Sequence, residues 1–237
     1  GSVETVSFAE DSWDTIVSAV QAGSTENYHV GDTKEVDMGT FGTHTIRVAN
    51  TSTPAECSTA GFSQTACGFV LEFADIITTH RMNSTNTNAG GWPATSMRTY
   101  VNNDIYNALP SELKNGIIDT YVVSGHGKND PANFTSTDKL YLLSTKEVWG
   151  KEGTSNVINY DTTDAYTRQL DYYKAQGVTT SNYSGAKKQY NGSNKGWWLR
   201  AAKSSYSTNF YYVNTNGDWN HYNANNSNWV APAFRIG

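Results

Sequence analysis

From Gly196 onward, short apolar runs alternate with polar turns, and this pattern constrains the fold more than any other stretch. Runs rich in aromatic and β-branched residues, bounded by turn signals, are typical of strands. The candidate strands are GWWLRAA (196–202), NFYYVN (209–214) and VAPAFRI (230–236), and NTNG (214–217) indicates a tight turn. This part of the chain is therefore expected to form a loop-rich sheet.

Local signals upstream predict three helices, the middle one of which could be a single helix or two short ones. Each has apolar residues at helical spacing, and the first and last also have a polar residue at the start and a glycine at the end. The predicted helices span residues 11–23, 94–110 and 161–177. Asp11 or Ser12 is the candidate cap of the first.

Strands are expected between these helices. An alternating run at 43–50 is typical of a half-buried strand, and a denser apolar run at 68–78 indicates a strand deep in the fold. Residues 111–125 are predicted to form a helical turn leading into a strand, and residues 138–150 a strand leading into a helical turn. Several helices followed by a β-rich end favour an α+β fold.

The length of 237 residues suits one well-filled domain or two small ones, and no internal repeat or clear linker divides the chain. We therefore expect a single α+β domain over residues 3–237. Gly1 and Ser2 are expected to be the remnant of a cleaved expression tag.

Charge narrows the classes of partner. Lys and Arg number 17 against 22 Asp and Glu, which gives a net charge of −5 with no strong basic cluster. Nucleic acids and anionic membranes attract clustered positive charge, so neither is an expected partner. No apolar run approaches the roughly 20 residues of a membrane span, which predicts no membrane insertion.

Motifs for catalysis or metal binding are nearly absent. There is no nucleophile elbow, P-loop or dinucleotide fingerprint, and the five histidines have no metal-ligand spacing. Ser124, His126 and Asp130 lie close in sequence, but triad members meet in space and a glycine-rich turn does not position them. Paired carboxylates for glycoside hydrolysis are not singled out by any pattern. The sequence predicts a non-catalytic protein with no cofactor and no metal.

Cys57 and Cys67 bracket an eleven-residue loop, CSTAGFSQTAC. They are either two unpaired thiols or one local disulfide with a structural role. Two cysteines without nearby histidines are too few for a tetrahedral zinc site.

The C-terminal segment carries the most specific signal for function. Between Trp197 and Gly237 there are ten aromatic residues and eight asparagines but only four charges, which suits contact with neutral polar partners. Five of its apolar residues are expected in the core: Trp197, Trp198, Leu199, Phe210 and Phe234. Burial of the polar residues of this segment would leave many asparagine side chains without hydrogen-bond partners, so they are expected at the surface. The residues expected there are Tyr206, Tyr211, Asn220, His221, Tyr222, Asn223 and Asn225.

A family resemblance covers about residues 12–237. The frame WWLR (197–200), NGDWN (216–220) and APAFRIG (231–237) resembles the C-terminal part of C-type-lectin-fold proteins of the formylglycine-generating-enzyme type. More narrowly, it resembles the variable proteins of diversity-generating retroelements. Upstream, residues 77–110 and 133–150 resemble an uncharacterised domain common in bacterial and phage surface proteins.

The resemblance implies a C-type lectin fold with a variable segment at about residues 200–229. In such families an error-prone reverse transcriptase mutates adenines, so Asn codons become codons for Tyr, Ser, Asp or His, but not Trp. Trp219 is therefore expected to be fixed framework. Trp229 stands where the family usually has Gly, so it is either a contact residue or a filler of a local gap.

The same resemblance implies which side chains meet the ligand, all displayed on one face of the sheet. Asn214 is also a candidate turn former. The expected ligand-binding residues are Ser204, Tyr206, Asn209, Tyr211, Asn214, Asp218, Asn220, His221, Tyr222, Asn223, Asn225, Asn228 and Trp229.

By this resemblance the chain is expected to bind a protein or cell-surface ligand, outside the cell, on a phage tail, a virion or a bacterial surface. Calcium-dependent sugar binding is not expected, because the E-P-N or Q-P-D triplet of such lectins is missing. Formylglycine-generating activity needs a late cysteine pair, and no cysteine follows Cys67. The alternative is a carbohydrate-binding module of fixed specificity, with sugars stacked on Trp219 and Trp229.

Overall fold

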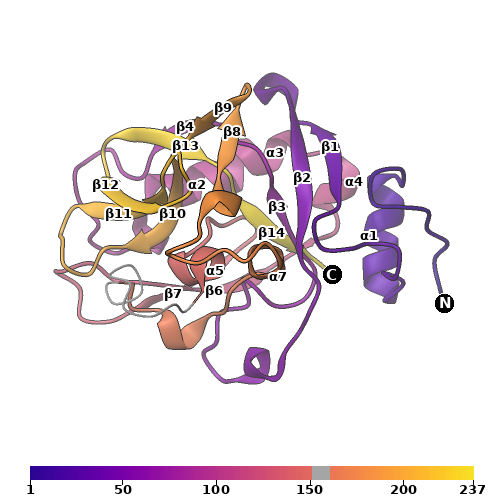
Figure 1. Cartoon of the computed structure of the whole chain (residues 1–237), viewed down its shortest axis with the longest axis horizontal. Coiled ribbons are helices and arrows are strands. Elements are labelled where there is room, and N and C mark those ends of the chain that lie inside the picture. Colours follow the sequence, from indigo (N-terminus) through magenta and orange to yellow (C-terminus); the bar gives the residue numbers. More distant parts are fainter. Residues whose placement is uncertain (151–160) are drawn as a thin grey trace.

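Two five-stranded sheets form the centre of the molecule (Figure 1). The computed structural model describes residues 1–150 and 161–237. In the first sheet the strand order is β1-β2-β3-β14-β5, and all neighbouring strands are antiparallel. Its strands are β1 (Thr33–Asp37), β2 (Thr43–Asn50), β3 (Val70–Phe73), β5 (Ile117–Ile118) and β14 (Ala233–Ile236). The last strand of the chain thus lies between strands from its first half.

The second sheet has the order β12-β11-β10-β13-β4, with β12 at its edge. Its strands are β4 (Thr78–Arg81), β10 (Trp197–Ala202), β11 (Asn209–Val213), β12 (Trp219–Asn223) and β13 (Ser227–Val230). Only β10 and β13 run parallel. Two separate hairpins pair β6 (Thr120–Ser124) with β7 (Phe134–Asp138), and β8 (Lys188–Tyr190) with β9 (Ser193–Lys195). This arrangement confirms the α+β class in one domain.

The first predicted helix is confirmed as α1 (Trp13–Ala22). Its N-cap is Ser12, whose hydroxyl accepts a hydrogen bond from the Thr15 amide at 3.1 Å. It ends at Gly23, which adopts the left-handed conformation with φ of 73°. The other helical segments include a π-helical turn that joins α2 to α3. They are η1 (Gly39–Phe41), η2 (Ala55–Ser58), η3 (Trp92–Ala94), α2 (Ser96–Tyr100), η4 (Val101–Ile105), α3 (Tyr106–Ala108), α4 (Ser111–Lys114), α5 (Thr145–Trp149), η5 (Asp164–Tyr166), α7 (Asp171–Ala175) and η6 (Ser184–Ala186).

The helix predicted over 161–177 is wrong for most of its length. Only a short turn, η5, and a five-residue helix, α7, form there. Between them Thr167 is extended and donates its hydroxyl to Glu147 at 2.7 Å, while the Arg168 guanidinium donates to Asn50 and to the Ala66 carbonyl. These contacts with distant segments need an extended backbone, and they override the local helical signal.

The predicted strands are largely confirmed, with two departures. The run at 68–78 is extended in β3 over only four residues, and the strand expected at the start of 138–150 is a single bridge between Tyr141 and Ala233. Conversely, β12 and most of β13 lie in the polar segment 214–229, which the sequence does not predict as strand, and Val230 of the run at 230–236 belongs to β13 and not to β14. Their asparagine-rich sequences have low strand propensity, so their pairing with β11 and β4 sets their conformation.

A buried ion pair fixes the middle of β10 to the rest of the domain. Arg200 is fully buried and donates to both carboxylate oxygens of Glu147 at 2.7 Å. Its guanidinium also donates to the carbonyls of Leu142 (2.8 Å) and Val123 (3.0 Å). With all these donors satisfied, the pair holds β10 against β6 and the start of α5.

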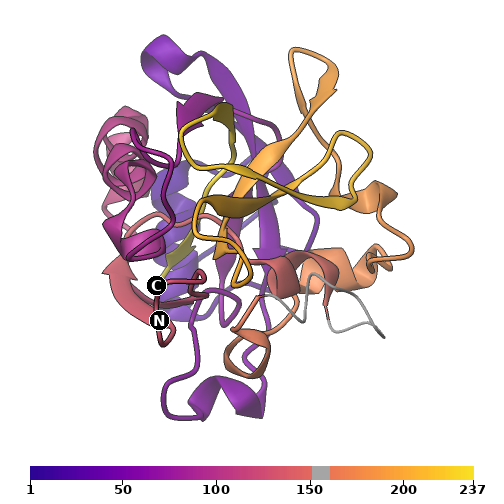
Figure 2. The ribbon, with the colours of Figure 1, turned by 90° about the vertical axis from the view of Figure 1, so that its left-hand side faces the viewer.

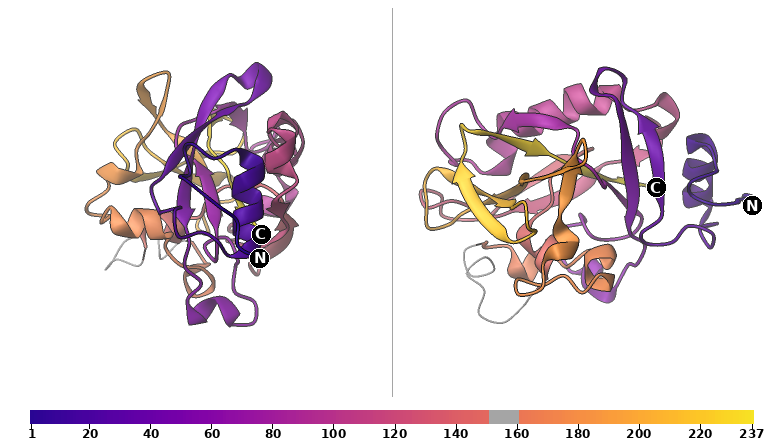
Figure 3. Two further views of the ribbon diagram at one scale, coloured as in Figure 1. Left: turned by 90° about the vertical axis from the view of Figure 1, so that its right-hand side faces the viewer. Right: turned by 45° about the horizontal axis from the view of Figure 1, so that its top comes forward.

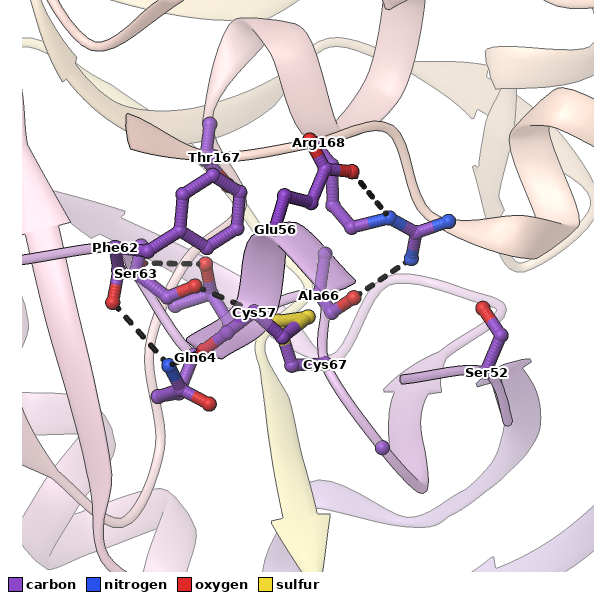
Figure 4. Close-up of a disulfide and its surroundings, with 12 residues drawn as sticks. Ser52, Glu56, Cys57, Phe62, Ser63, Gln64, Ala66, Cys67, Thr167 and Arg168 are labelled. Atoms are coloured by element: carbon purple, nitrogen blue, oxygen red, sulfur yellow. Dashed lines mark hydrogen bonds and ion pairs between the residues drawn. A yellow bond between two sulfur atoms is a disulfide. The ribbon is translucent and has the colours of Figure 1, made fainter. Parts of the chain in front are cut away.

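Cys57 and Cys67 form a disulfide, which resolves the two alternatives for these residues (Figure 4). The loop between them is further tied to its surroundings through Ser63 and Gln64. The Ser63 amide donates to the Tyr166 carbonyl at 2.7 Å, and the Gln64 amide donates to the Tyr121 carbonyl at 2.8 Å.

The core confirms one part of the sequence prediction fully. All five apolar residues expected there, Trp197, Trp198, Leu199, Phe210 and Phe234, are fully buried. The hairpin of β11 and β12 lies at the end of the molecule opposite α1 and the N-terminus (Figures 1 and 3), and Figure 2 looks onto that end. Within the described residues, no helix has the length and apolar character needed to span a membrane.

Candidate binding face

The β11–β12 hairpin is closed by a turn that is anchored in the core. The Asn214 amide donates to the Asp218 carbonyl at 2.7 Å, and Gly217 has φ of 93°, where a side chain would be strained. A Cβ at Gly217 would also lie 2.0 Å from the Tyr183 carbonyl oxygen. The buried Trp149 indole donates to the Gly217 carbonyl at 3.0 Å. Asn214 is therefore a turn former, as its sequence context suggested.

The other end of β12 is anchored as well. The Ala224 amide donates to the Thr208 carbonyl at 2.9 Å, and the Ala224 carbonyl accepts from the Asn83 amide at 3.0 Å. The backbone of β12 is thus held at both ends, while its side chains lie at the edge of the sheet.

The register divides the candidate residues between two sides of the sheet. Tyr211 pairs with His221, and Phe210 pairs with Tyr222. Because successive side chains of a strand point to opposite faces, neighbouring pairs lie on opposite sides. We call one side the His221 face (Asn209, Tyr211, Trp219, His221 and Asn223) and the other the Tyr222 face (Tyr212, Asn220 and Tyr222). The expectation that all candidates share one face is therefore wrong.

Aromatic rings form the Tyr222 face. The ring of Tyr222 lies 6.1 Å from that of Trp198 and 6.0 Å from that of Tyr212, measured between centroids. Trp198 is fully buried, whereas Tyr222 is 43% exposed. The outer ring therefore rests on a buried one and presents its free side to solvent.

The His221 face combines rings with amides. The ring of His221 lies 4.9 Å from Tyr206 and 6.5 Å from Trp219. Burial and the nearby charge of Lys203 lower the pKa of His221 below its usual value, so the ring is neutral at pH 7. The Nδ1 of His221 accepts a hydrogen bond from the side-chain amide of Asn209 at 2.8 Å.

Lys203 lies beneath this face and was not among the predicted site residues. Its ammonium is 5.2 Å from the centroid of the Tyr206 ring and 5.7 Å from that of Tyr211. Burial lowers the pKa of Lys203. A single lysine in an aromatic and asparagine-rich stretch gives no sequence signal of this position.

Three candidate residues are buried, which corrects the expectation that they meet the ligand. Tyr211 is fully buried, with its ring 6.2 Å from that of Trp219. Asn209 and Asn228 are 8% and 9% exposed. The Asn209 side-chain amide donates to the His221 ring. The Asn228 side-chain oxygen accepts from the Trp229 backbone amide at 3.0 Å. Asn209 and Tyr211 thus support the His221 face from beneath, whereas Asn228 lies on β13, which β10 and β11 separate from β12.

The remaining candidates reach the surface to different degrees. Tyr206, Tyr222 and Asn223 are exposed. The half-buried candidates are Ser204, Asn214, Asp218, Asn220, His221, Asn225 and Trp229. Trp229 lies apart from the others, because β10 and β11 separate its strand from β12 and its ring packs 4.6 Å from that of Tyr190. It fills the space beside the β8–β9 hairpin.

No constellation for catalysis is found in the part of the chain that the structure describes. Ser124 ends β6, His126 contacts the Gly127 carbonyl through Nδ1, and Asp130 accepts from the Gly90 amide. No hydrogen bond joins these three side chains to one another. Residues 1–150 and 161–237 also contain no group of three His, Cys, Asp or Glu side chains that could hold a metal ion. What the C-terminal sheet offers is contact through rings, amides and hydroxyls.

Comparison with known proteins gives one match. A family model described as "Domain of unknown function (DUF6273)" matches residues 69–237, a span that begins just before β3 and includes the whole second sheet. No curated protein and no solved structure matches the chain.

Proposed function

The chain belongs to the DUF6273 family, a domain of unknown function, and from the geometry of its second sheet we propose that it is a non-catalytic ligand-binding protein. Its β11–β12 hairpin binds a protein or a cell-surface molecule without a cofactor. The domain has the C-type lectin fold and acts outside the cell, on a phage tail, a virion or a bacterial surface. The WWLR, NGDWN and APAFRIG motifs support this reading of fold and setting.

The observation that carries the proposal is the edge position of β12 on a backbone anchored at both ends. A rigid scaffold that presents exposed side chains is the usual arrangement of binding sites. The side chains of Asn220, His221, Tyr222 and Asn223 are exposed or half-buried, so their replacement creates no cavity in the core. Binding specificity can therefore change here at little cost in stability.

The distribution of residue types supports diversification of this face. The exposed or half-buried positions Asn220, His221, Tyr222, Asn223 and Asn225 all carry Asn or a residue reachable from an Asn codon by changes at adenines. Trp219, which is not reachable in this way, packs against the buried Tyr211. The surface positions thus suit diversification and Trp219 suits the frame, whereas Asn209, Tyr211 and Asn228 carry residue types of the same kind but are buried.

The alternative of a fixed carbohydrate site on Trp219 and Trp229 is less well supported. Both rings are half-buried, and β10 and β11 lie between their strands. A sugar chain stacked on both rings would have to cross two strands of the sheet.

A pair of variants tests the proposed binding face. In the face variant Tyr206, His221 and Tyr222 are all replaced by Asn, and in the frame variant Tyr211 alone is replaced by Asn. Fluorescently labelled protein is applied to a panel of bacterial cells, and thermal unfolding is recorded in parallel. We expect the face variant to unfold within a few degrees of the wild type and to lose cell binding. The proposal fails if the face variant is folded and binds the same cells as strongly as the wild type.

The frame variant serves as the matched control. We expect it to unfold at a clearly lower temperature, because it places an amide in a fully buried ring site. Together the two variants separate the loss of a contact from the loss of the fold.

A further inference from the structure

A second concave site lies outside the binding face, against the β6–β7 hairpin. It is a cleft of ≈ 520 Å³, within the range of about 300–1,000 Å³ typical of small-ligand sites. Its walls include Tyr121 of β6, Tyr166 of η5 and the polar residues His126, Asn133, Thr135 and Thr162. None of these residues belongs to the His221 face or the Tyr222 face.

Two exposed tyrosines are the main apolar walls of this cleft. Tyr121 is 38% exposed and Tyr166 is 44% exposed. Among the described residues, the only other aromatic side chains exposed to this degree are Tyr206 and Tyr222 of the binding face. Exposed rings that gather in one concavity, beside polar groups, are typical of a ligand site.

The backbone beneath the cleft is held by the disulfide-closed loop. Within that loop the Ser63 amide donates to the Tyr166 carbonyl, and the Gln64 amide donates to the Tyr121 carbonyl. The Ser63 hydroxyl accepts from the Val123 amide at 3.1 Å. Figure 4 shows Ser63 and Gln64 on the segment that runs into Cys67. One cross-linked loop therefore fixes the spacing of both tyrosines before any ligand arrives, which reduces the entropy lost on binding.

Asn133, Thr135 and Thr162 supply neutral donors and acceptors to the cleft. The Asn133 side-chain amide donates to the Thr162 carbonyl at 2.9 Å, and the Thr162 hydroxyl donates to the Asn133 side-chain oxygen. His126 donates from Nδ1 to the Gly127 carbonyl at 2.7 Å. No Lys, Arg, Asp or Glu side chain of the described residues lines the cleft.

We propose that this cleft is a binding site for a neutral oligosaccharide. A sugar ring has apolar C–H faces, which suit the tyrosine rings, and hydroxyl groups around its rim, which suit the amide, hydroxyl and imidazole groups. Among the described residues no Lys or Arg lines the cleft, which makes it a poor site for phosphorylated or carboxylated ligands. A proline-rich peptide also docks on aromatic grooves, but it has few groups that would hydrogen-bond the polar side chains of this cleft.

The test is a titration of the whole chain with neutral trisaccharides of glucose, mannose and N-acetylglucosamine, followed by amide chemical shifts. Sialyllactose and a decaproline peptide are the comparison probes. We expect at least one neutral trisaccharide to bind and to shift amides of β6 and of residues 161–166. Tyr121→Ala and Tyr166→Ala should each weaken that binding at least about tenfold, whereas Tyr121→Phe and Tyr166→Phe should change it by less than about threefold.

Tyr222→Ala is the matched control, because it removes an equally exposed ring from the binding face. It should leave saccharide affinity unchanged, so the outcome is independent of the function proposed for that face. The inference is overturned if no neutral trisaccharide binds at millimolar concentration, or if both alanine variants bind as the wild type does. Tighter binding of decaproline than of every trisaccharide would equally overturn it.

Discussion

Tyr211 and His221 lie directly opposite each other on β11 and β12, and Tyr211 is fully buried whereas His221 is half-buried. A single cross-strand pair is thus divided between the frame and the surface of the binding face. This division lets outer residues change while the sheet beneath them stays fixed.

Replacing each member of this pair should separate stability from binding. Tyr211→Ala should lower the free energy of unfolding by about 3 kcal/mol, since it empties a buried ring site. His221→Ala should lower it by less than about 1 kcal/mol. Urea denaturation of the two variants measures the difference. Equal losses in both would show that Tyr211 is not a frame residue.

Because Tyr206 and Tyr222 belong to opposite sides of the hairpin, one compact ligand should depend strongly on only one of them. For that ligand, one of the variants Tyr206→Ala and Tyr222→Ala should lose about 2 kcal/mol of binding free energy and the other less than about 0.5 kcal/mol. Calorimetric titration measures both. Large losses in both variants would show that ligands wrap around the edge of β12.

His44 should make stability depend on pH. Its Nδ1 lies 2.7 Å from an Asp75 carboxylate oxygen and its Nε2 lies 2.7 Å from the Phe41 carbonyl oxygen, so both nitrogens face acceptors. Burial alone lowers the pKa of His44, but the contacts with Asp75 and Phe41 outweigh burial and raise it. Because the pKa of His44 is higher in the folded state, protonated His44 stabilises the fold. This stabilisation is complete below the unfolded-state pKa of about 6.5 and is lost as pH rises through the folded-state pKa.

The wild type should therefore exceed His44→Gln in unfolding free energy most at about pH 5.5, and the difference should shrink by about pH 9. Denaturation at both pH values tests this, with His29→Gln at an exposed site as the control. A difference in unfolding free energy that stays constant or grows with pH would contradict the raised pKa of His44.

The buried pair of Glu147 and Arg200 should be costly to break. Arg200→Leu leaves the Glu147 carboxylate buried without its cation and should destabilise the fold by about 3–5 kcal/mol. The control is Lys139→Gln, which breaks a surface pair with Asp119 (3.1 Å) and should cost less than about 1 kcal/mol. Similar losses in the two variants would show that Arg200 does not anchor β10.

Removing the disulfide should loosen the loop that holds Tyr121 and Tyr166. The double variant Cys57→Ser, Cys67→Ser should lose about 2–3 kcal/mol of unfolding free energy, because the closed loop is short. Adding a reductant should lower the melting temperature of the wild type to about that of the double variant. The melting temperature of the double variant itself should not change. A wild type unchanged by reductant would argue against a stabilising cross-link.

Local signals predicted parts of the fold well. The cap at Ser12, the stop at Gly23 and the apolar run that forms β10 are all short-range features, and each is confirmed. The extended backbone at Thr167 and the contacts of the Arg168 side chain were not predictable, because their partners Glu147 and Asn50 are distant in sequence. Tertiary hydrogen bonds decided the conformation there.

The exposure of part of the proposed binding face was predicted from the sequence, but the division of its residues between two sides was not. The composition of residues 200–229 indicated a polar and aromatic surface, and Tyr206, Tyr222 and Asn223 do lie on it. The register of β11 with β12 sets which side chains share a side of the hairpin, and the asparagine-rich sequence did not reveal β12 as a strand. The buried Tyr211 ring packs against Trp219 of β12, a cross-strand contact that no local pattern could have given.

The most direct test of the proposed function is to sequence this gene from many members of its natural population. Substitutions should concentrate at the codons of surface residues and interchange with Asn, as at Tyr206, Asn220, His221, Tyr222 and Asn223. The codons of the buried Phe210, Tyr211 and Val213 should stay nearly constant. Uniformly low variation across both groups would contradict a diversified binding face.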